Sequence, residues 1–326
     1  MTKLSWGGDE MTHKFPATNP DGISPRRGFG KSIWKYRWFY LLMLPGMLYF
    51  IVYRYAPMWG LLMAFQDYMP TLGIANSQWV GLKHFKAFFT YDRFYLLFRN
   101  TMFISVGSLV FSFPIPIILA LLLNEVRNRT FKRATQTMLY LPHFLSSVVI
   151  VSIAYAMFSS QDGVVNNLLS SMGFERQNIL MNEKTYRSLY IGLGIWQNSG
   201  WSTIIYLAAL AGVDVQMYEA STIEGANRLQ QVRFITLPSI MPILMVNLIL
   251  SLGSIMDVGV EKTLLLSNAM NRSVAEVFDS YVYNRGVLGG EFSYSAAVGM
   301  FKSLVGLILV LGANGLSKKV TDEAIY

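Results

Sequence analysis

Long apolar segments dominate this sequence and limit what it can fold into. Apolar residues make up 53% of its 326 residues and charged residues only 14%, a balance too apolar for a soluble domain. A helix needs about 20 apolar residues to cross the hydrocarbon core of a bilayer. We therefore predict an all-α membrane protein with six transmembrane helices. The six segments lie at about residues 38–56, 101–123, 137–158, 187–210, 239–260 and 293–316.

Polar sequence flanks this apolar region at both ends. Residues 1–35 are rich in polar residues, glycine and proline, which predicts a flexible cytoplasmic tail without a signal peptide. Residues 36–319 would form the transmembrane domain, and residues 320–326 a short C-terminal tail. The Gly28-Phe-Gly30-Lys31-Ser32 stretch lacks the earlier glycine and the preceding strand of a phosphate-binding loop. No nucleotide site is expected on this chain.

Basic residues set the expected orientation. Seven Lys and Arg residues lie in residues 1–37 and four lie in 125–133, whereas the connections on the opposite side carry fewer per residue. By the positive-inside rule, both termini and the loop 211–238 face the cytoplasm. The net charge of +8 is then a topology signal and predicts no nucleic-acid partner.

Several kinds of chemistry are disfavoured by composition. The sequence has no cysteine, and its three histidines (His13, His84 and His143) are far apart, so neither a disulfide nor a metal site is expected. It has no Gly-x-Ser-x-Gly or His-Glu-x-x-His motif and no pair of carboxylates placed for acid–base catalysis. The protein is predicted not to be an enzyme.

Residues 218–238 form a polar stretch between two apolar segments. The residues from Val215 onward favour a helix, and Gly225 can take the positive φ at which that helix would stop. Asn227 followed by Gln230 has the spacing of a capping box that starts a second helix. Pro238 is expected to end that helix, because proline has no backbone N–H to donate. The pattern describes either a rigid corner that a partner could bind or an ordinary loop.

Two ionisable residues lie within apolar segments. Asp257 and Lys302 would each cost roughly 2.5–3.5 kcal/mol if left unpaired in the middle of a bilayer. Both should therefore face protein or water. They line an aqueous path for a transported solute or form structural pairs.

A polar and aromatic patch begins within the fourth apolar segment. Its members are Trp196, Gln197, Asn198 and Trp201, with Ser199 between them. Amides can hydrogen-bond sugar hydroxyls, and aromatic rings can stack on the C–H faces of a sugar. The patch predicts either a sugar-binding path or ordinary packing between helices.

The polar stretch also resembles a known motif. Its residues read Glu219-Ala220-Ser221-x-x-Glu224-Gly225-Ala226, then eight residues, then Ile235-x-Leu237-Pro238. This is similar to the EAA motif found in the membrane subunits of ABC importers. Ser221 stands where that family usually has alanine, and Glu224 where it usually has aspartate.

The likeness extends over residues 35 to 319. Further stretches resemble binding-protein-dependent sugar permeases of the LplB/YtcP type. They are Leu44–Phe50, Phe113–Glu125, Tyr140–Phe144, Ile205–Gly212 and Tyr294–Gly299.

This resemblance implies the type I ABC importer permease fold, a location in the bacterial inner (cytoplasmic) membrane, and a set of partners. They are a second, distinct permease subunit, two ATP-binding subunits that hold ATP and Mg²⁺, and an external solute-binding protein. This chain itself would carry no cofactor. Its cytoplasmic corner would couple to the ATPase, and the implied coupling residues are Tyr218, Glu219, Ala220, Ser221, Glu224, Gly225, Ala226, Leu237 and Pro238.

The resemblance also points to an oligosaccharide as the cargo, and acidic ones such as alginate or pectin fragments come first. Two alternatives remain open. One is an ABC permease for a non-sugar solute. The other is a self-contained secondary transporter, for which paired repeats and several membrane-embedded ionisable residues would be expected.

Overall fold

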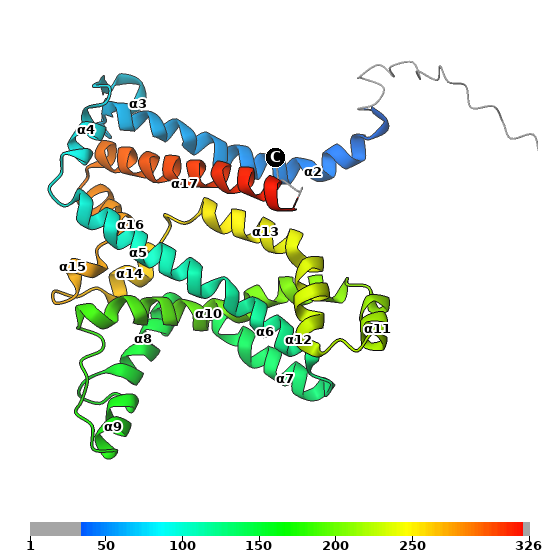
Figure 1. The fold of residues 1–326 in the computed structure, drawn as a ribbon. Coiled ribbons are helices and arrows are strands. Elements are labelled where there is room, and N and C mark those ends of the chain that lie inside the picture. The colour runs from blue at the N-terminus through cyan, green and yellow to red at the C-terminus, as the bar shows by residue number, and fades with distance from the viewer. Residues whose placement is uncertain (1–33, 322–326) are drawn as a thin grey trace, which may run out of the picture. The chain divides into compact units, whose positions relative to one another are not determined.

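The computed structural model describes residues 34–321 and divides the chain into two units, residues 1–59 and 60–326 (Figure 1). The predicted tail at residues 1–35 lies outside the described residues except for its last two. Of the predicted C-terminal tail, residues 320 and 321 belong to the last helix.

The first unit is a helical segment. It contains α2 (Arg37–Phe50), the π-helix η1 (Ile51–Tyr55) and the start of the 3-10 helix η2 (Ala56–Phe65). Pro45 lies inside α2. The apolar helix Arg37–Phe65, which is long enough to cross a membrane, begins in this unit.

In the second unit, a short β-hairpin follows the end of η2, and the all-α prediction omits it. β1 (Gln66–Asp67) pairs antiparallel with β2 (Gln78–Trp79), and the small helices α3 (Gly73–Asn76) and α4 (Lys83–Phe89) adjoin it. The Asp67 carboxylate accepts a 2.6 Å hydrogen bond from Lys83 Nζ, and this bond lowers the pKa of Asp67.

Helices make up the rest of this unit. Their bounds are α5 (Phe94–Ser112), α6 (Pro114–Glu125), α7 (Arg129–Tyr140), η3 (Leu141–Phe144), α8 (Ser147–Phe158), α9 (Val164–Ser171), α10 (Glu183–Ala211), α11 (Val215–Ile223), α12 (Arg228–Gln231), η4 (Val232–Thr236), α13 (Leu237–Gly253), α14 (Val260–Leu266), α15 (Arg272–Ala275), α16 (Phe278–Val282), η5 (Tyr283–Leu288) and α17 (Phe292–Thr321).

Four helices in residues 34–321 are long and apolar enough to cross a membrane: Arg37–Phe65, Phe94–Glu125, Arg228–Gly253 and Phe292–Gly315. A fifth span results if the bent pair Arg129–Phe144 and Ser147–Phe158 crosses as one. The predicted segment 187–210 forms α10, but Gln197 and Asn198 make it more polar than the other four. The structure thus contains four or five candidate spans, and the presence of six remains a prediction.

The predicted segment 137–158 is not one continuous helix. The chain bends by 106° within it, between η3 and α8. Ser146 caps the new helix by accepting a hydrogen bond from Val149 N at 3.4 Å, and Pro142 lies in the short helix before the bend. A cap and a proline so close together favour two helices over one.

Pro238 does not end its helix, so that prediction is also wrong. α12, η4 and α13 form one helix from Arg228 to Gly253, and Pro238 lies in its interior. The turn before the proline, Val232–Thr236, is a π-helix. A π-turn changes the pattern of backbone hydrogen bonds locally, and this is where a residue without an N–H can be accommodated.

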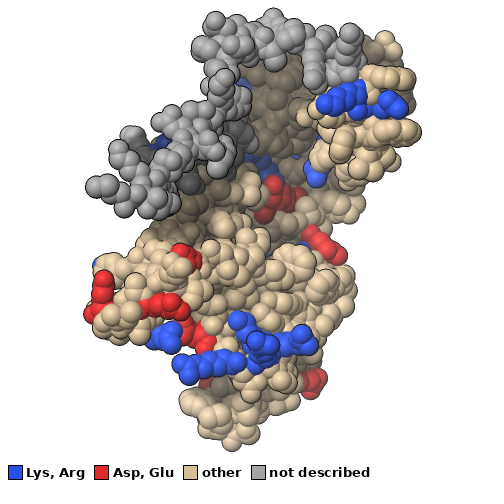
Figure 2. Space-filling model, turned by 90° about the vertical axis from the view of Figure 1, so that its right-hand side faces the viewer, with Lys and Arg blue, Asp and Glu red and all other residues tan. Residues whose placement is uncertain are grey.

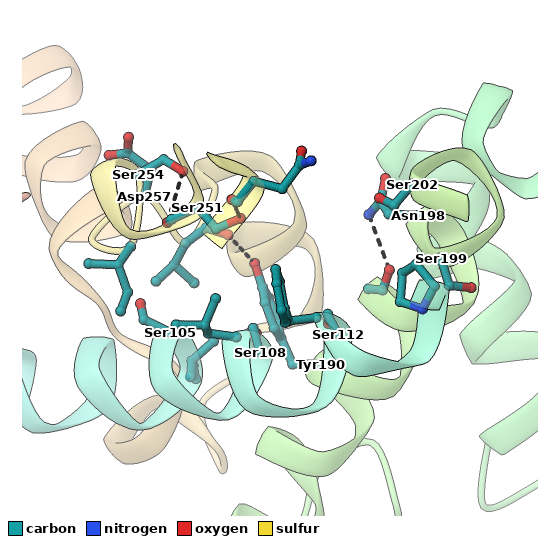
Figure 3. Close-up of a pocket in the computed structure, with 18 of the residues that line it drawn as sticks. Ser105, Ser108, Ser112, Tyr190, Asn198, Ser199, Ser202, Ser251, Ser254 and Asp257 are labelled. Carbon is teal, nitrogen blue, oxygen red and sulfur yellow. Dashed lines mark hydrogen bonds between the residues drawn. The ribbon is translucent and has the colours of Figure 1, made fainter. Parts of the chain in front are cut away.

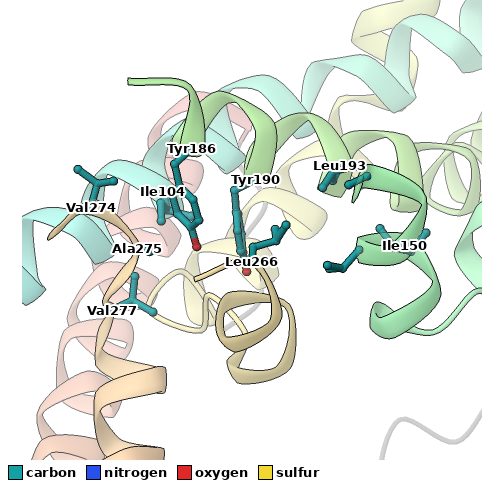
Figure 4. Packing of buried hydrophobic residues seen from close by; sticks show 11 residues of the cluster. Ile104, Ile150, Tyr186, Tyr190, Leu193, Leu266, Val274, Ala275 and Val277 are labelled. Carbon is teal, nitrogen blue, oxygen red and sulfur yellow. The ribbon is translucent and has the colours of Figure 1, made fainter. Parts of the chain in front are cut away.

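Buried apolar side chains of the second unit form three clusters. The first joins α5, α8, α10 and α14 around Tyr186 and Tyr190 (Figure 4). The second is aromatic, with the Phe88 ring 5.0 to 5.6 Å from those of Phe94, Phe278 and Phe301. The third packs α6 and α10 against α13. These clusters hold α10 and α13 in place around the polar space described below.

Two close approaches fix the helices further. A Cβ at Gly200 of α10 would lie 2.0 Å from Leu139 O of α7, so only glycine fits there. Likewise, a Cβ at Gly306 of α17 would lie 2.8 Å from Gly253 O of α13. α13 and α17 therefore pack backbone against backbone, and they lie side by side in Figure 1.

Candidate functional site

The predicted corner is a pair of short helices, α11 and α12, here called the coupling corner (residues 214–236). Asp214 caps α11 by accepting a hydrogen bond from Gln216 N at 2.9 Å. Gly225 has φ +83°, a backbone conformation that favours glycine. The capping box forms as predicted, since Asn227 Oδ1 accepts from Gln230 N at 2.9 Å and Gln230 Oε1 accepts from Asn227 N at 2.7 Å.

Side-chain hydrogen bonds hold the two arms of the coupling corner together. Tyr218 on α11 has its hydroxyl 2.8 Å from Thr236 Oγ1 in η4. Buried Gln231 donates from Nε2 to Ser221 Oγ and to Thr222 Oγ1, each at 3.0 Å. These bonds satisfy a buried amide and therefore favour the observed angle between the arms.

A concavity of about 480 Å³ lies on the inner side of the corner. Five of the predicted coupling residues line it: Ala220, Ser221, Glu224, Gly225 and Ala226. Glu219 is exposed beside it. Leu237 and Pro238 do not line it, because Leu237 packs on the third apolar cluster and Pro238 continues the helix.

The outer side of the corner is apolar and exposed. Ile223 is 88% exposed and Leu229 is 77% exposed. Such side chains at a helix corner are typical of a surface that a partner covers.

Figure 2, which looks toward the end of the second unit with α7 and α11, shows basic side chains gathered there beside acidic ones. One such pair joins Arg228 NH1 to Glu125 Oε2 at 3.5 Å.

A polar cavity of about 360 Å³ lies between α5, α10 and α13 (Figure 3). Hydroxyl and amide groups from all three helices face it. They belong to Ser105, Ser108 and Ser112 of α5, Asn198, Ser199 and Ser202 of α10, and Asn247, Ser251 and Ser254 at the end of α13. Many small hydroxyls in an otherwise apolar bundle suit a polyhydroxylated ligand.

Most of these cavity residues were not predicted from the sequence, although their helical spacing could have indicated them. Ser105, Ser108 and Ser112 recur at i, i+3 and i+7, and so lie on one face of a helix. Asn247, Ser251 and Ser254 recur at i, i+4 and i+7. Polar stripes of this kind within apolar segments indicate a face turned toward water or a ligand.

The structure separates the predicted path residues into two groups. Asn198 and Asp257 line the cavity, while Trp196, Gln197, Trp201 and Lys302 do not. Trp196 faces an apolar groove between α8 and α10. Trp201 stacks on the His143 ring at 4.7 Å.

Gln197 and Asn198 are held by hydrogen bonds. Gln197 Nε2 donates to Leu145 O at 3.1 Å, which joins α10 to the bend before α8. Asn198 Oδ1 lies 3.1 Å from His143 Nδ1, and its Nδ2 donates to Gly194 O. In the aromatic and amide patch, therefore, Asn198 and Ser199 face the cavity, whereas Gln197 and Trp201 contact the residues that precede α8.

Lys302 has a structural role in an ion-pair network. Its ammonium pairs with Asp257 Oδ1 at 2.9 Å and with Asp279 of α16. Asp279 Oδ2 also accepts from Val258 N at 2.8 Å and from Gly259 N at 3.0 Å. Asp279 lies between the fifth and sixth predicted apolar segments, and it was not predicted to pair with Lys302.

Lys262 of α14 lies in the cavity wall. Its Nζ lies 4.1 Å from the centroid of the Tyr190 ring. Burial lowers the pKa of Lys262 to about 8.

Among residues 34–321, no group of three or more His, Asp or Glu side chains could hold a metal ion.

Comparison with known proteins identifies the family. Residues 112–322 match the family described as the binding-protein-dependent transport system inner membrane component. The chain belongs to this family. It is therefore the membrane-spanning permease subunit of an ABC transporter, a transport subunit rather than an enzyme, which confirms the resemblance based on the EAA motif.

Curated relatives support this assignment. The chain is 51% identical over 290 residues to the polygalacturonan/rhamnogalacturonan transport system permease protein YteP of Bacillus subtilis (strain 168), covering 89% of this chain and 90% of that protein. It is 47% identical to protein LplB of the same organism, covering 89% and 91%.

A solved structure with the same fold is the bacterial alginate ABC transporter in complex with its alginate pentasaccharide-bound periplasmic protein. One chain of it matches with a TM-score of 0.83 and 36% identity, over 91% of this chain and 99% of that chain. This match establishes the ABC importer permease fold for the present protein.

Proposed function

We propose that this permease subunit passes an acidic oligosaccharide of the pectin or alginate type across the bacterial inner membrane. Two relatives support this cargo, since one is named for polygalacturonan and rhamnogalacturonan transport and the other transports alginate. An external solute-binding protein would deliver the sugar. A second, distinct permease subunit would complete the path.

One observation carries this proposal. A single 26-residue helix, Arg228–Gly253, begins in the coupling corner and ends beside the polar cavity. It supplies Gln231 and Phe234 to the corner, and Asn247 and Ser251 to the cavity wall. A movement of the corner therefore reaches the ligand-facing residues without an intervening loop.

The coupling corner would dock on one of two ATP-binding subunits, which hold the ATP and Mg²⁺. Exposed Ile223 and Leu229 would supply apolar contact, and the exposed Glu219 carboxylate would pair with a basic residue of the ATPase. ATP binding favours the closed ATPase dimer, so it shifts the two permease subunits from an inward-facing toward an outward-facing state. Both termini would then lie in the cytoplasm.

Gly225 provides the test of this coupling role. In Gly225→Asp, a carboxylate enters the docking surface at a residue whose φ of +83° costs other residues about 1–2 kcal/mol. We expect the assembled transporter to lose at least about nine-tenths of its sugar-stimulated ATP hydrolysis. The measurement uses the complete complex in liposomes with its solute-binding protein.

Gly173 offers a matched control. It has φ +85° and, like Gly225, open space where a Cβ would lie, but it follows α9 and lies outside the corner. Gly173→Asp therefore carries the same backbone strain without touching the docking surface. Equal losses in the two variants would contradict the coupling role. Accumulation of sugar by liposomes that contain this chain alone would contradict the proposed function as a whole.

A further inference from the structure

We propose that Lys262 is the residue of the polar cavity that binds the carboxylate of a uronate unit, and that it selects acidic over neutral oligosaccharides. This inference rests on the proposed function and adds a residue and a chemical group to it. Neither the EAA motif nor the polar patch of α10 points to this lysine.

The position of Lys262 is the first argument. Its ammonium reaches the cavity from α14 and lies over the Tyr190 ring of α10, 4.1 Å from the centroid. The Tyr190 hydroxyl donates to Val258 O at 2.6 Å, so the ring is held in place beneath the ammonium. On α10, a Cβ at position 194 would lie 3.2 Å from Lys262 Nζ, and Gly194 leaves that space free.

The charges around Lys262 are the second argument. In the part of the chain that the structure describes, no carboxylate lies within 4.0 Å of Lys262 Nζ. Asp257 in the cavity wall and Asp279 on α16 both pair with Lys302. α8, which also packs against α14, carries no charged residue. A partly buried ammonium beside a cavity and without a counter-ion is well placed to bind an anion.

The neighbouring hydroxyl groups indicate what kind of anion fits. Ser105 Oγ is buried in the cavity wall and has no hydrogen-bond partner within residues 34–321. Ser108 and Ser112 extend the same row along α5 (Figure 3). A buried hydroxyl normally has a partner, and the hydroxyls of a sugar ring both donate and accept. One cation with a row of hydroxyls matches a sugar unit that carries a single carboxylate.

Selection follows from the cost of leaving the ammonium unpaired. An acidic sugar supplies a charge-assisted hydrogen bond to Lys262, whereas a neutral sugar would displace water from the ammonium without replacing the charge. A site that loses a charged hydrogen bond discriminates strongly, because the buried group then remains unsatisfied.

The test is direct binding to the complete transporter in nanodiscs without the solute-binding protein, since that protein could select acidic sugars itself. The probes are trigalacturonate and its carboxyl-reduced, uncharged counterpart. We expect the unchanged transporter to bind trigalacturonate at least about 10-fold more tightly, which corresponds to about 1.4 kcal/mol. Lys262→Met should remove that preference and leave binding of the neutral probe within about twofold.

Further variants keep the test decisive. Lys262→Gln gives a second uncharged side chain in case the methionine variant does not assemble, and Lys262→Arg keeps the charge and should keep the preference. Lys184→Met removes an exposed lysine outside the cavity and should change nothing. An unchanged preference in the methionine and glutamine variants would overturn the assignment of Lys262. If the unchanged transporter binds neither probe, the proposed function itself fails.

Discussion

Lys302 pairs with two carboxylates that differ in burial, and the two pairs should therefore differ in their contribution to stability. The Lys302 and Asp279 side chains are only 12% and 11% exposed, whereas the Asp257 side chain is 69% exposed. Breaking a buried ion pair by removing one partner costs about 3–5 kcal/mol, because the other charge stays buried without compensation. An exposed pair contributes about 0–1 kcal/mol.

Asparagine at either position tests this difference. In Asp279→Asn, the amide oxygen can still accept from Val258 N and Gly259 N, so the substitution removes mainly the charge. For a domain of this size, about 1 kcal/mol shifts the melting temperature by roughly 2–4 °C. Asp279→Asn should therefore lower it by about 6–20 °C, and Asp257→Asn by less than about 4 °C.

The assay is thermal unfolding of the purified transporter in detergent, followed by intrinsic fluorescence. Replacing both members of the buried pair, in Lys302→Met with Asp279→Asn, should recover part of the loss because the only carboxylate left without its partner, Asp257, is exposed to solvent. A loss in Asp257→Asn that equals or exceeds the loss in Asp279→Asn would refute the reasoning from burial.

Two further predictions concern the cavity and the corner. Because the pKa of Lys262 is lowered to about 8, its ammonium is present at lower pH and is lost as the pH rises through that value. The preference for trigalacturonate should therefore be present at pH 6.5 and weaken by pH 9, while Lys262→Arg keeps it at both. A preference that is independent of pH in the unchanged protein would contradict this. In Asn227→Ala, loss of the capping box should cost about 1 kcal/mol and raise amide hydrogen exchange in residues 225–231 about fivefold. Asn128→Ala, at the cap of α7, should leave exchange in the corner unchanged.

Local rules were sufficient to predict the coupling corner. A helix stop at Gly225 and a capping box from Asn227 to Gln230 depend on residues within a few positions of one another, and the structure has both. These interactions are short-range, so their spacing in the sequence determines their geometry.

Pro238 shows where a local rule fails. Pro238 has no backbone N–H to donate, but a π-turn just before it lets the helix continue. No sequence pattern in the residues from Val232 to Thr236 predicts that π-turn. Packing of Leu237, Ile240 and Leu244 against α6 and α10 holds the helix together.

The cavity and the Lys302 network depend on contacts between distant parts of the chain. Asp279 lies 23 residues from Lys302, and its carboxylate is oriented by the backbone at Val258 and Gly259. Ser105, Asn198 and Ser251 come from three different helices. Spacing in a single sequence gives the face of each helix, but it does not tell which faces meet.

The unbroken helix from Arg228 to Gly253 has a mechanical consequence. At about 1.5 Å per residue, its 26 residues extend over roughly 39 Å, so a tilt of only about 5° displaces one end by about 3 Å relative to the other. A hydrogen bond to Ser251 does not survive a displacement of that size. A small angular change at the coupling corner is thus sufficient to break the hydrogen bonds that the proposed cargo would make with the hydroxyls of α13.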